Sequence, residues 1–203
     1  MSTLLFSSAC RWELGIIVGV ILLGILFQNF ILIFIALLTL LFLGFFYRVP
    51  SFMVEKLGKN VLQSPSTGKI IEIQKKEHGN KIFIYLSLLD PHVQFVPIGG
   101  FVRKVDRVDG PNEFAGTVKE KKNSIVTDIE TVHGDTITVI QNTGLISRRI
   151  VNFLKPGDWI KKGDKLGFIK FGSRVDVLVP SSFQLKVVPG QYVKIGDILA
   201  SQQ

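Results

Sequence analysis

The first quarter of the chain is almost wholly apolar, whereas the rest alternates between apolar and polar positions. No charged residue occurs from Leu14 to Tyr47, where most positions are Ile, Leu, Val, Phe or Gly. As one straight helix this run would be about 50 Å long, against about 30 Å for the hydrocarbon core of a bilayer. The pattern therefore predicts a membrane anchor over residues 1–47. It is either a transmembrane helical hairpin that turns at Gln28 and Asn29, which we favour, or one long tilted helix.

Residues 48–203 consist of short β-rich runs separated by turn residues, which is typical of one mainly β domain. One short helix is expected at Ile146–Leu154, because Ile146, Ile150 and Leu154 recur at four-residue spacing. The expected strands are Lys69–Gln74, Lys81–Ser87, Ser124–Val132, Asp135–Gln141, Ser173–Val179 and Gln184–Val188.

An internal repeat reduces the number of β folds that fit the sequence. Pro156–Leu166 recurs as Pro189–Leu199 with the shared pattern Pro-Gly-x-aromatic-apolar-Lys-x-Gly-Asp-x-Leu. Each copy predicts two tight turns around a short strand, which resembles the hammerhead of barrel-sandwich folds, including lipoyl and biotinyl carriers. We therefore expect a barrel-sandwich-like β domain with hammerhead repeats, preceded by the N-terminal transmembrane hairpin. A membrane-tethered carrier or adaptor is a rival, although the stretch Lys170–Arg174 has no typical carrier motif.

The positive charge lies in the β domain. Of the 24 Lys and Arg residues only Arg11 precedes residue 48, and of the 16 Asp and Glu residues only Glu13 does. The β domain therefore carries the whole net charge of +8. A basic domain beside a membrane anchor favours attraction to anionic lipid. A merely solvated basic surface is an alternative; nucleic-acid binding is not expected, because no recognition motif or aromatic stacking ladder is present. Arg48, Lys56 and Lys59 place this side of the anchor in the cytosol by the positive-inside rule.

Cysteine and histidine do not indicate a metal site. Cys10 is the single cysteine, which excludes an internal disulfide and a cysteine metal site. His78, His92 and His133 are scattered and have no paired carboxylates nearby in the sequence, so no metal is expected. His78 and His133 stand beside glycine in polar turns and are expected to be exposed to solvent.

The pair Gly172-Ser173 interrupts the run that otherwise reads as a strand near the C-terminus. Glycine permits backbone conformations that other residues avoid. The hydroxyl of Ser173 could attack the carbonyl before it, and such a strained Gly-Ser bond can rearrange to an ester and break by elimination, leaving a pyruvoyl group. The alternative interpretation is a strand with a glycine bulge and a surface serine.

The surroundings of this pair favour the chemical interpretation. The chain closely resembles the phosphatidylserine decarboxylase proenzyme family, in its short bacterial and archaeal branch, over nearly its whole length. The more specific blocks contain Arg148-Arg149 and Phe-Gly-Ser-Arg-Val, and the others are weaker. In chain order the matching blocks are Ser64–Ile70, Tyr85–Gln94, Ile140–Val151, Lys155–Ile169 and Phe171–Val175.

The resemblance implies an activity and a set of roles. The chain would cut itself between Gly172 and Ser173 into fragments 1–172 and 173–203, which stay associated, and Ser173 would become a pyruvoyl group. That group would form a Schiff base with phosphatidylserine in the membrane and release CO2 and phosphatidylethanolamine. His92 would return the proton to the α-carbon, and Arg148 and Arg149 suit the lipid phosphate. The expected location is the cell membrane with the catalytic domain on the cytosolic side, and a homodimer is compatible with this picture.

The chain departs from the family pattern at three positions. Thr67 replaces an Asp that is thought to assist self-cleavage, Phe95 stands where one branch has a second His, and Phe114 replaces an Arg. A threonine hydroxyl does not ionise near neutral pH, so it cannot act as a base; Asp90 is the nearest acidic candidate. A catalytically silent homologue, or the adaptor above, is therefore the alternative to an active decarboxylase.

Overall fold

The structure is a computed structural model that describes residues 11–50, 60–111, 116–118, 123–144, 149–169 and 173–202. The chain divides into two compact units, Met1–Pro50 and Ser51–Gln203. Each unit is described by itself.

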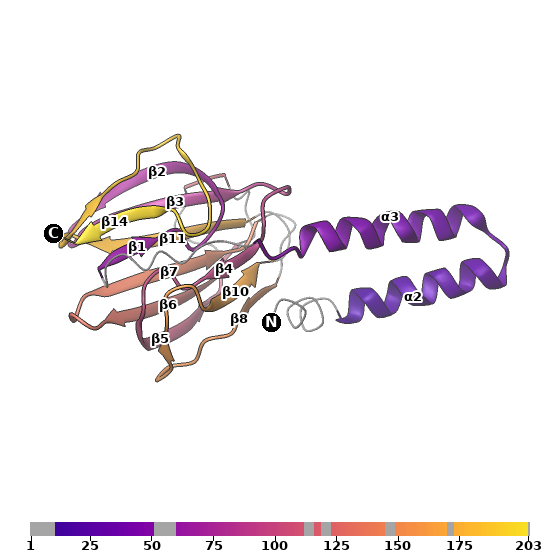
Figure 1. Cartoon of the computed structure of the whole chain (residues 1–203), viewed down its shortest axis with the longest axis horizontal. Helices are drawn as coiled ribbons and strands as arrows, with labels where there is room; N and C mark the ends of the chain where they lie inside the picture. Colours follow the sequence, from indigo (N-terminus) through magenta and orange to yellow (C-terminus); the bar gives the residue numbers. More distant parts are fainter. Residues whose placement is uncertain are drawn as a thin grey trace. The chain divides into compact units, whose positions relative to one another are not determined.

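The first unit is a helical hairpin made of α2 (Arg11–Leu26) and α3 (Phe30–Phe46) (Figure 1). The turn between them lies at the polar pair expected from the sequence. Gln28 adopts a φ of 50°, and the Asn29 side chain accepts a hydrogen bond from the Leu32 N–H at 3.1 Å, which caps α3. The single long helix is therefore wrong, because the chain reverses at this turn.

The transmembrane part of the expectation is not supported. No helix among the described residues is long and apolar enough to cross a bilayer. The turn splits the apolar run into arms of 16 and 17 residues. At 1.5 Å per residue each arm is only about 25 Å long, which is shorter than a typical hydrocarbon core.

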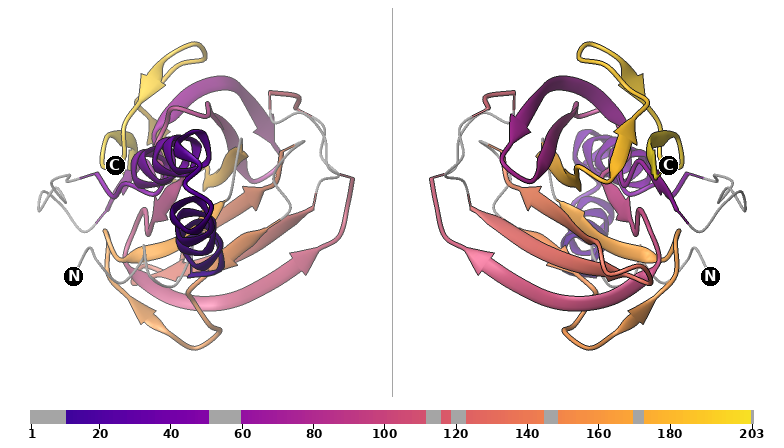
Figure 2. Two further views of the ribbon diagram at one scale, coloured as in Figure 1. Left: turned by 90° about the vertical axis from the view of Figure 1, so that its right-hand side faces the viewer. Right: turned by 90° about the vertical axis from the view of Figure 1, so that its left-hand side faces the viewer.

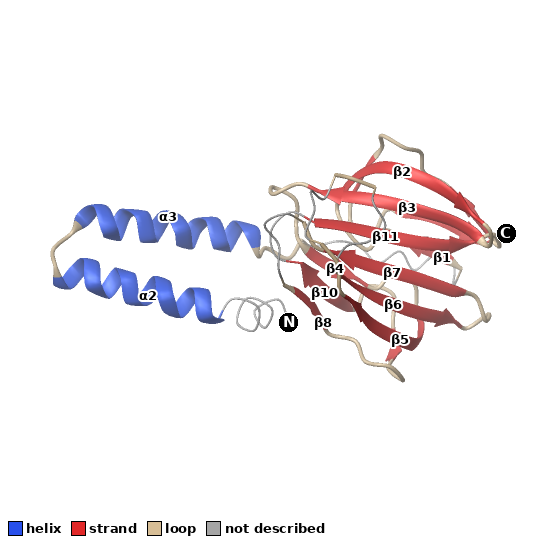
Figure 3. Cartoon of the chain, turned by 180° about the vertical axis from the view of Figure 1, so that it is seen from behind, coloured by secondary structure: helices blue, strands red, loops and turns tan. Residues whose placement is uncertain are grey.

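The described part of the second unit is built from strands, so the mainly β prediction is confirmed (Figure 3). Eight strands form one curled antiparallel sheet in the order β13-β2-β3-β11-β7-β6-β5-β9, which bends into a half-barrel (Figure 2). Two three-stranded sheets accompany it, β1-β14-β12 and β4-β10-β8. The strands are β1 (Val61–Gln63), β2 (Gly68–Lys76), β3 (Gly79–Leu86), β4 (Val93–Phe95), β5 (Gly100–Val108), β6 (Ser124–Thr131), β7 (Thr136–Asn142), β8 (Ile150–Asn152), β9 (Trp159–Ile160), β10 (Lys165–Ile169), β11 (Ser173–Pro180), β12 (Phe183–Leu185), β13 (Tyr192–Val193) and β14 (Ile198–Gln202).

The core lies on the inner face of the curled sheet, where alternate residues of each strand are apolar. β11 contributes Val175, Val177 and Val179 to it, and β3 contributes Ile82 and Ile84. The intervening residues of the same strands point to the outer face, because successive side chains alternate across a strand. This parity places the side chain of the first residue of β11 on the core face.

The predicted helix at Ile146–Leu154 is wrong where the structure describes it, because Ile150–Asn152 is strand β8. This strand pairs with β10, with Ile150 opposite Ile169. A spacing of four residues puts side chains on one face of a helix, but it also puts them on one face of a strand. The segment forms a strand because Ile150 and Val151 are β-branched and because the edge of β10 was available for pairing.

The sequence repeat folds into two equivalent pairs of turns. Gly157, Gly163, Gly190 and Gly196 all have φ between 84° and 93°, a conformation that favours glycine. In both copies the Asp of the Gly-Asp pair accepts a backbone N–H three residues before it, at 2.7 and 2.8 Å. The short strands of the two copies, β9 and β13, form the two opposite edges of the eight-stranded sheet.

A second repeat, which the sequence analysis missed, accompanies the first. The segment from β1 into β2 has the same contacts as the segment from β4 into β5. The Ser64 N–H donates to the Asp197 carbonyl at 2.7 Å, and the Val96 N–H donates to the Asp164 carbonyl at 2.7 Å. The described part of the domain thus contains two similar halves, each made of two successive strands and one hammerhead-like turn unit.

Candidate active site

Ser173 is the first residue of β11, a strand inside the eight-stranded sheet. Its backbone is paired with Leu86 of β3, and its side chain is fully buried on the core face. Its Oγ has no hydrogen-bond partner among the residues that the structure describes. Buried hydroxyls normally have a partner, so an unsatisfied one is unusual. Gly172, the other half of the predicted cleavage site, lies outside the described residues.

Arg174, the residue after Ser173, is held on the outer face of the sheet by hydrogen bonds. Arg174 is fully buried and donates to both carboxylate oxygens of Asp176, at 2.6 and 2.9 Å, and to the Thr117 carbonyl. Lys81 Nζ lies 3.3 Å from the same carboxylate. A buried charge is tolerated only when it is paired in this way. The network therefore holds the start of β11 in place, directly beside Ser173.

His92 is fully buried just before β4. Its Nδ1 lies 2.7 Å from the Asp90 carbonyl oxygen. A carbonyl oxygen can only accept, so Nδ1 carries the proton in this contact and donates it. The other ring nitrogen, Nε2, is then the one that can gain or lose a proton.

Chain connectivity places His92 and Ser173 at the same end of the sheet. The Ile169 N–H donates to the His92 carbonyl at 3.2 Å. Ile169 is four residues before Ser173, so their Cα atoms are at most about 14 Å apart. The end of β10 thus connects the His92 backbone to the segment that leads into Ser173.

Three carboxamides, those of the buried Gln94 and Gln141 and of the half-buried Asn152, form a chain of hydrogen bonds that ends at His92. Gln94 Nε2 donates to the His92 carbonyl at 2.7 Å, and Gln141 Nε2 donates to Gln94 Oε1 at 2.9 Å. Asn152 Nδ2 donates to Gln141 Oε1 at 3.1 Å and to Thr127 Oγ1 at 2.8 Å. The chain runs from β6 and β8 through β7 to β4, so it crosses the interior from one sheet to another.

The two ends of this chain fix its direction. The Leu154 N–H donates to Asn152 Oδ1 at 2.8 Å, and a backbone N–H can only donate. At the other end the His92 carbonyl can only accept. Every amide between them must therefore present its NH2 toward His92, and none can be flipped without losing a bond.

Glycine at one position makes room for the chain. Gly167 of β10 lies between Gln94 on β4 and Asn152 on β8, and it is paired with both. A Cβ at this glycine would stand 2.6 Å from Gln141 Nε2. The Val151 carbonyl oxygen of the neighbouring strand is closer still, so this backbone and the Gln141 side chain together exclude a side chain at position 167 of β10. The sequence did not predict roles for Gln94, Gln141 and Asn152; the detectable signal was a glutamine at an inward-facing position of β7, after Ile137 and Val139.

Thr67 and Asp90 both have structural partners. Thr67 is largely buried, and its Oγ1 accepts the Ile195 N–H at 3.1 Å. The Asp90 carboxylate accepts the backbone N–H and the hydroxyl of Ser87, each at 2.8 Å, and the hydroxyl of Tyr192. Asp90 thereby holds the turn between β3 and His92.

The other predicted positions are dispersed. Arg149 is exposed next to β8, whereas Arg148 and Phe114 lie outside the described residues. His78 and His133 are exposed, as predicted.

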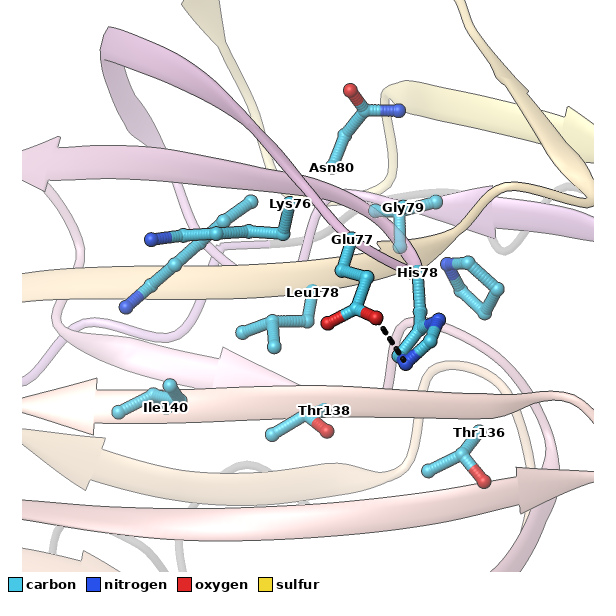
Figure 4. Close-up of a pocket in the computed structure, with 12 residues that line it drawn as sticks. Lys76, Glu77, His78, Gly79, Asn80, Thr136, Thr138, Ile140 and Leu178 are labelled. Carbon is cyan, nitrogen blue, oxygen red and sulfur yellow. Dashed lines mark ion pairs between the residues drawn. The ribbon is translucent and has the colours of Figure 1, made fainter.

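The pocket in Figure 4 lies away from Ser173. It has a volume of about 590 Å³ and is lined by residues of the β2–β3 turn, including His78, and by Thr138, Leu178 and Pro180. Pro180 and Ser173 are the two ends of β11, about 23 Å apart at the rise of a strand. The pocket therefore belongs to the opposite end of the sheet.

Comparisons with known proteins agree with the resemblance seen in the sequence. The family model described as phosphatidylserine decarboxylase matches residues 48–201. The phosphatidylserine decarboxylase proenzyme of Solibacter usitatus is 36% identical over 168 residues, covering 82% of this chain and 81% of the relative. That of Geotalea uraniireducens is 34% identical over 175 residues, covering 80% of each.

A third relative, the phosphatidylserine decarboxylase proenzyme of Desulfotalea psychrophila, is 36% identical over 183 residues, covering 85% of this chain and 84% of its own. The solved glucose permease IIA from Mycoplasma capricolum, with a TM-score of 0.43 and 16% identity over 69% of this chain and 93% of its own, is too distant to inform the argument. The family match covers the whole β domain, and the chain belongs to the phosphatidylserine decarboxylase family.

Proposed function

We propose that this protein is a phosphatidylserine decarboxylase made as a proenzyme. It converts phosphatidylserine to phosphatidylethanolamine and CO2 after cutting its own chain between Gly172 and Ser173. Membership of the family supports the reaction, and the buried, unpartnered hydroxyl of Ser173 is the observation that supports the cutting. The two halves of the β domain further support a barrel-sandwich-like arrangement around this site.

The maturation step uses Ser173 alone as nucleophile. Its Oγ attacks the Gly172 carbonyl carbon, the peptide C–N bond breaks and an ester forms. Elimination then breaks the Oγ–Cβ bond, releases the Gly172 carboxylate and leaves a dehydrated residue. Its tautomer, an imine, takes up water and loses ammonia, which leaves a pyruvoyl group at the start of β11.

Ser173 fits this group because its side chain is buried and has no competing hydrogen bond among the described residues. The pyruvoyl carbonyl supplies an electron sink for the decarboxylation. The Arg174–Asp176 network keeps the new chain end in its strand after the cut.

His92 is the proposed proton donor to the substrate α-carbon. Its Nδ1 proton is engaged by the Asp90 carbonyl, so Nε2 is the atom that delivers the proton. The carboxamide chain from Asn152 to Gln94 holds the His92 backbone, and this fixes the position from which the ring acts. These contacts favour His92 over the exposed His78 and His133.

The substrate phosphate and the membrane are further parts of the proposal. Arg149 is exposed beside β8, whose first residue pairs with Ile169 close to the His92 carbonyl. A guanidinium there can bind a phosphate through paired donors, and Arg148 is its proposed partner. The apolar side chains of α2 and α3 that face solvent, among them Leu26 and Phe30, suit attachment to a lipid membrane.

A catalytically silent homologue is the second candidate. The Thr67 hydroxyl accepts the Ile195 N–H and cannot ionise near neutral pH, and Asp90 is engaged by Ser87 and Tyr192. These contacts favour slow maturation. The silent protein would keep the fold and stay in one piece.

One experiment separates the two candidates. Full-length protein is purified in detergent and incubated with phosphatidylserine that carries an isotope label in the serine carboxyl group, and labelled CO2 and protein mass are measured in the same samples. An active proenzyme gives CO2 together with two fragments, the smaller with a blocked N-terminus.

Ser173→Ala is the matched control, because it removes only the hydroxyl. It is expected to remain a single chain of 22.6 kDa, apart from the substitution, and to release no CO2. Wild-type protein that folds, stays intact on long incubation and releases no CO2 would establish the silent alternative. Cleaved, folded protein without CO2 release would contradict the decarboxylase assignment.

A further inference from the structure

Two leucines protrude from the turn that joins β3 to His92. Leu88 and Leu89 are 45% and 67% exposed, although Leu86 just before them is fully buried. Single exposed leucines are common on protein surfaces, but adjacent ones on a short, fixed turn are a concentrated apolar surface. We call residues 87–90 the dileucine turn.

The dileucine turn is held in shape from both ends. The Asp90 carboxylate accepts two hydrogen bonds from Ser87 and one from the Tyr192 hydroxyl, and the Asp90 N–H donates to the Ser87 carbonyl at 3.1 Å. A turn closed in this way cannot easily fold its two leucines back onto the domain. The hydrogen bonds of the turn therefore keep both leucine side chains exposed.

The dileucine turn borders the candidate active site. Leu86 is paired with Ser173, and His92 follows Asp90 by two residues. The substrate headgroup must reach these two buried residues while its acyl chains stay in an apolar environment. A turn that is apolar at its tip and adjacent to both residues suits this requirement.

Exposed basic residues lie at the same end of the sheet, where the exposed Asp109 after β5 is also found. Lys69 is exposed and paired with Tyr85, and Arg107 is exposed one residue before the end of β5. Arg149 is exposed next to the strand that pairs with Ile169. Exposed basic residues at the same end of the sheet as an apolar tip suit a surface that meets anionic lipid.

We propose that the dileucine turn docks the active-site end of the sheet on an anionic phospholipid bilayer, with Leu88 and Leu89 inserted among the acyl chains. This inference rests on the proposed function, because a phospholipid substrate is what requires the active site to face a membrane. The occupant is the bilayer surface, and a protein partner for the same residues is an outcome that the test can reveal.

Insertion is measured directly with an environment-sensitive fluorophore. In full-length protein with Cys10→Ser, a nitrobenzoxadiazole label is attached at Leu89→Cys, and phosphatidylserine-containing vesicles are added. Position 89 should shift to shorter emission wavelength and be quenched by nitroxides on the acyl chains. Depth at one position is the readout, because the apolar helices α2 and α3 can attach the chain to vesicles by themselves.

The matched control is the same label at Val132→Cys. Val132 is 54% exposed, in the turn between β6 and β7 at the other end of the sheet. The two ends are separated by about 23 Å, the length of β11. Label 132 should stay in water. Equal quenching at both positions, or no quenching at 89, overturns the proposal.

A second measurement connects docking to turnover. Leu88→Ser combined with Leu89→Ser should lower the ratio of activity on vesicles to activity on monomeric short-chain phosphatidylserine by about tenfold, which corresponds to about 1.4 kcal/mol of lost docking energy. Val132→Ser should leave that ratio unchanged. An equal fall on both substrates would contradict docking and indicate a role in the fold or the chemistry.

The two proposals fail in different ways. If wild-type protein has no activity on either substrate while label 89 is buried in lipid, the decarboxylase assignment fails and docking stands. If both substrates are turned over but label 89 remains in water on lipid vesicles, docking fails. A label at 89 that is shielded only when another protein is added would assign the turn to a protein partner instead.

Discussion

At the scale of single residues, the chemistry of the site depends on which atoms are already engaged. The Nδ1 proton of His92 is donated to the Asp90 carbonyl, so Nε2 is the ring nitrogen that can exchange a proton. The Thr67 hydroxyl is occupied by the Ile195 N–H, whereas Ser173 Oγ has no partner among the described residues. Ser173, the proposed nucleophile, thus differs from Thr67 in having no competing hydrogen bond among the described residues, a state that it shares with the buried hydroxyl of Ser66.

His92→Ala is predicted to separate maturation from catalysis. The variant should still yield both fragments if wild type does, because Ser173 retains its strand position. Its decarboxylation rate should fall by about 10²- to 10⁴-fold, the usual range for loss of a general acid. Fragment formation is followed by mass spectrometry and turnover by labelled CO2. His133→Ala, at an exposed turn, is the control and should behave like wild type; full activity of His92→Ala would refute the assignment.

Thr67→Asp is predicted to accelerate the appearance of the two fragments. A carboxylate at this position can still accept the Ile195 N–H and can also orient a base, with a gain of up to about 10⁴-fold in the related arrangement of catalytic triads. Because the site is largely buried, an unpaired charge would cost stability, so folding is checked by circular dichroism.

Thr67→Ser keeps the hydroxyl and controls for the change of shape at this site. It should mature at the wild-type rate. A folded Thr67→Asp protein that cleaves no faster than wild type would show that this chain does not depend on a carboxylate at this position.

At the scale of secondary-structure elements, the interior is organised by hydrogen bonds between strands from different sheets. Gln141 comes from β7 of the eight-stranded sheet and bridges Gln94 and Asn152 on β4 and β8 of a smaller sheet. Gly167 on β10 leaves the space that this bridge fills. The bridge therefore ties the backbone of His92 to the sheet that contains Ser173.

Gln141→Leu is predicted to lower both stability and turnover. It leaves the buried Gln94 Oε1 without its donor, which costs about 1–3 kcal/mol, and it removes one of the two acceptors of the half-buried Asn152 amide. Loss of positioning should lower kcat by about 10- to 100-fold with little change in KM, since the residue does not contact substrate. Urea unfolding and steady-state kinetics measure the two effects.

Gln74→Leu provides the comparison for this variant. Gln74 is only partly buried and bonds Glu72 on its own strand, so it tests the loss of a glutamine outside the carboxamide chain. It should change neither kcat nor KM. A Gln141→Leu protein that is less stable but has wild-type kcat would show that the chain serves the fold alone.

At the scale of the whole β domain, the segment that would become the small fragment is paired with several strands of the rest of the domain. β11 lies between β3 and β7, and both neighbours belong to the large fragment. β13 pairs with β2, and β14 pairs with β1. A cut before Ser173 would therefore remove one covalent bond and leave the strand pairing intact.

The two fragments are accordingly predicted to remain in one particle after cleavage. They should co-elute in gel filtration in mild detergent and separate only in denaturant, because releasing β11 would expose backbone groups and core side chains together. A stable large fragment that elutes without the small one under native conditions would contradict this arrangement.

The sequence by itself determined the features that depend on local order. The apolar run and its polar pair predicted the helical hairpin, and period-two alternation predicted strands such as β6 and β11. Glycines in the Pro-Gly and Gly-Asp pairs predicted the repeated turns, since few other residues adopt a positive φ. The family blocks further selected Ser173 and His92, because the residue types needed for the chemistry stand in a recognisable order.

Only the tertiary structure decided the features that depend on contacts between distant segments. Ile150–Asn152 is a strand because the edge of β10 was available to pair, although its spacing also fits a helix. The roles of Gln94, Gln141 and Asn152 arise from a hydrogen-bond chain whose members are up to 58 positions apart, which no local pattern encodes. The lengths of the two apolar helices α2 and α3 likewise depend on the point at which the chain reverses. Long-range packing chooses among structures that local preference leaves nearly equal in energy, and here it chose the partners of His92.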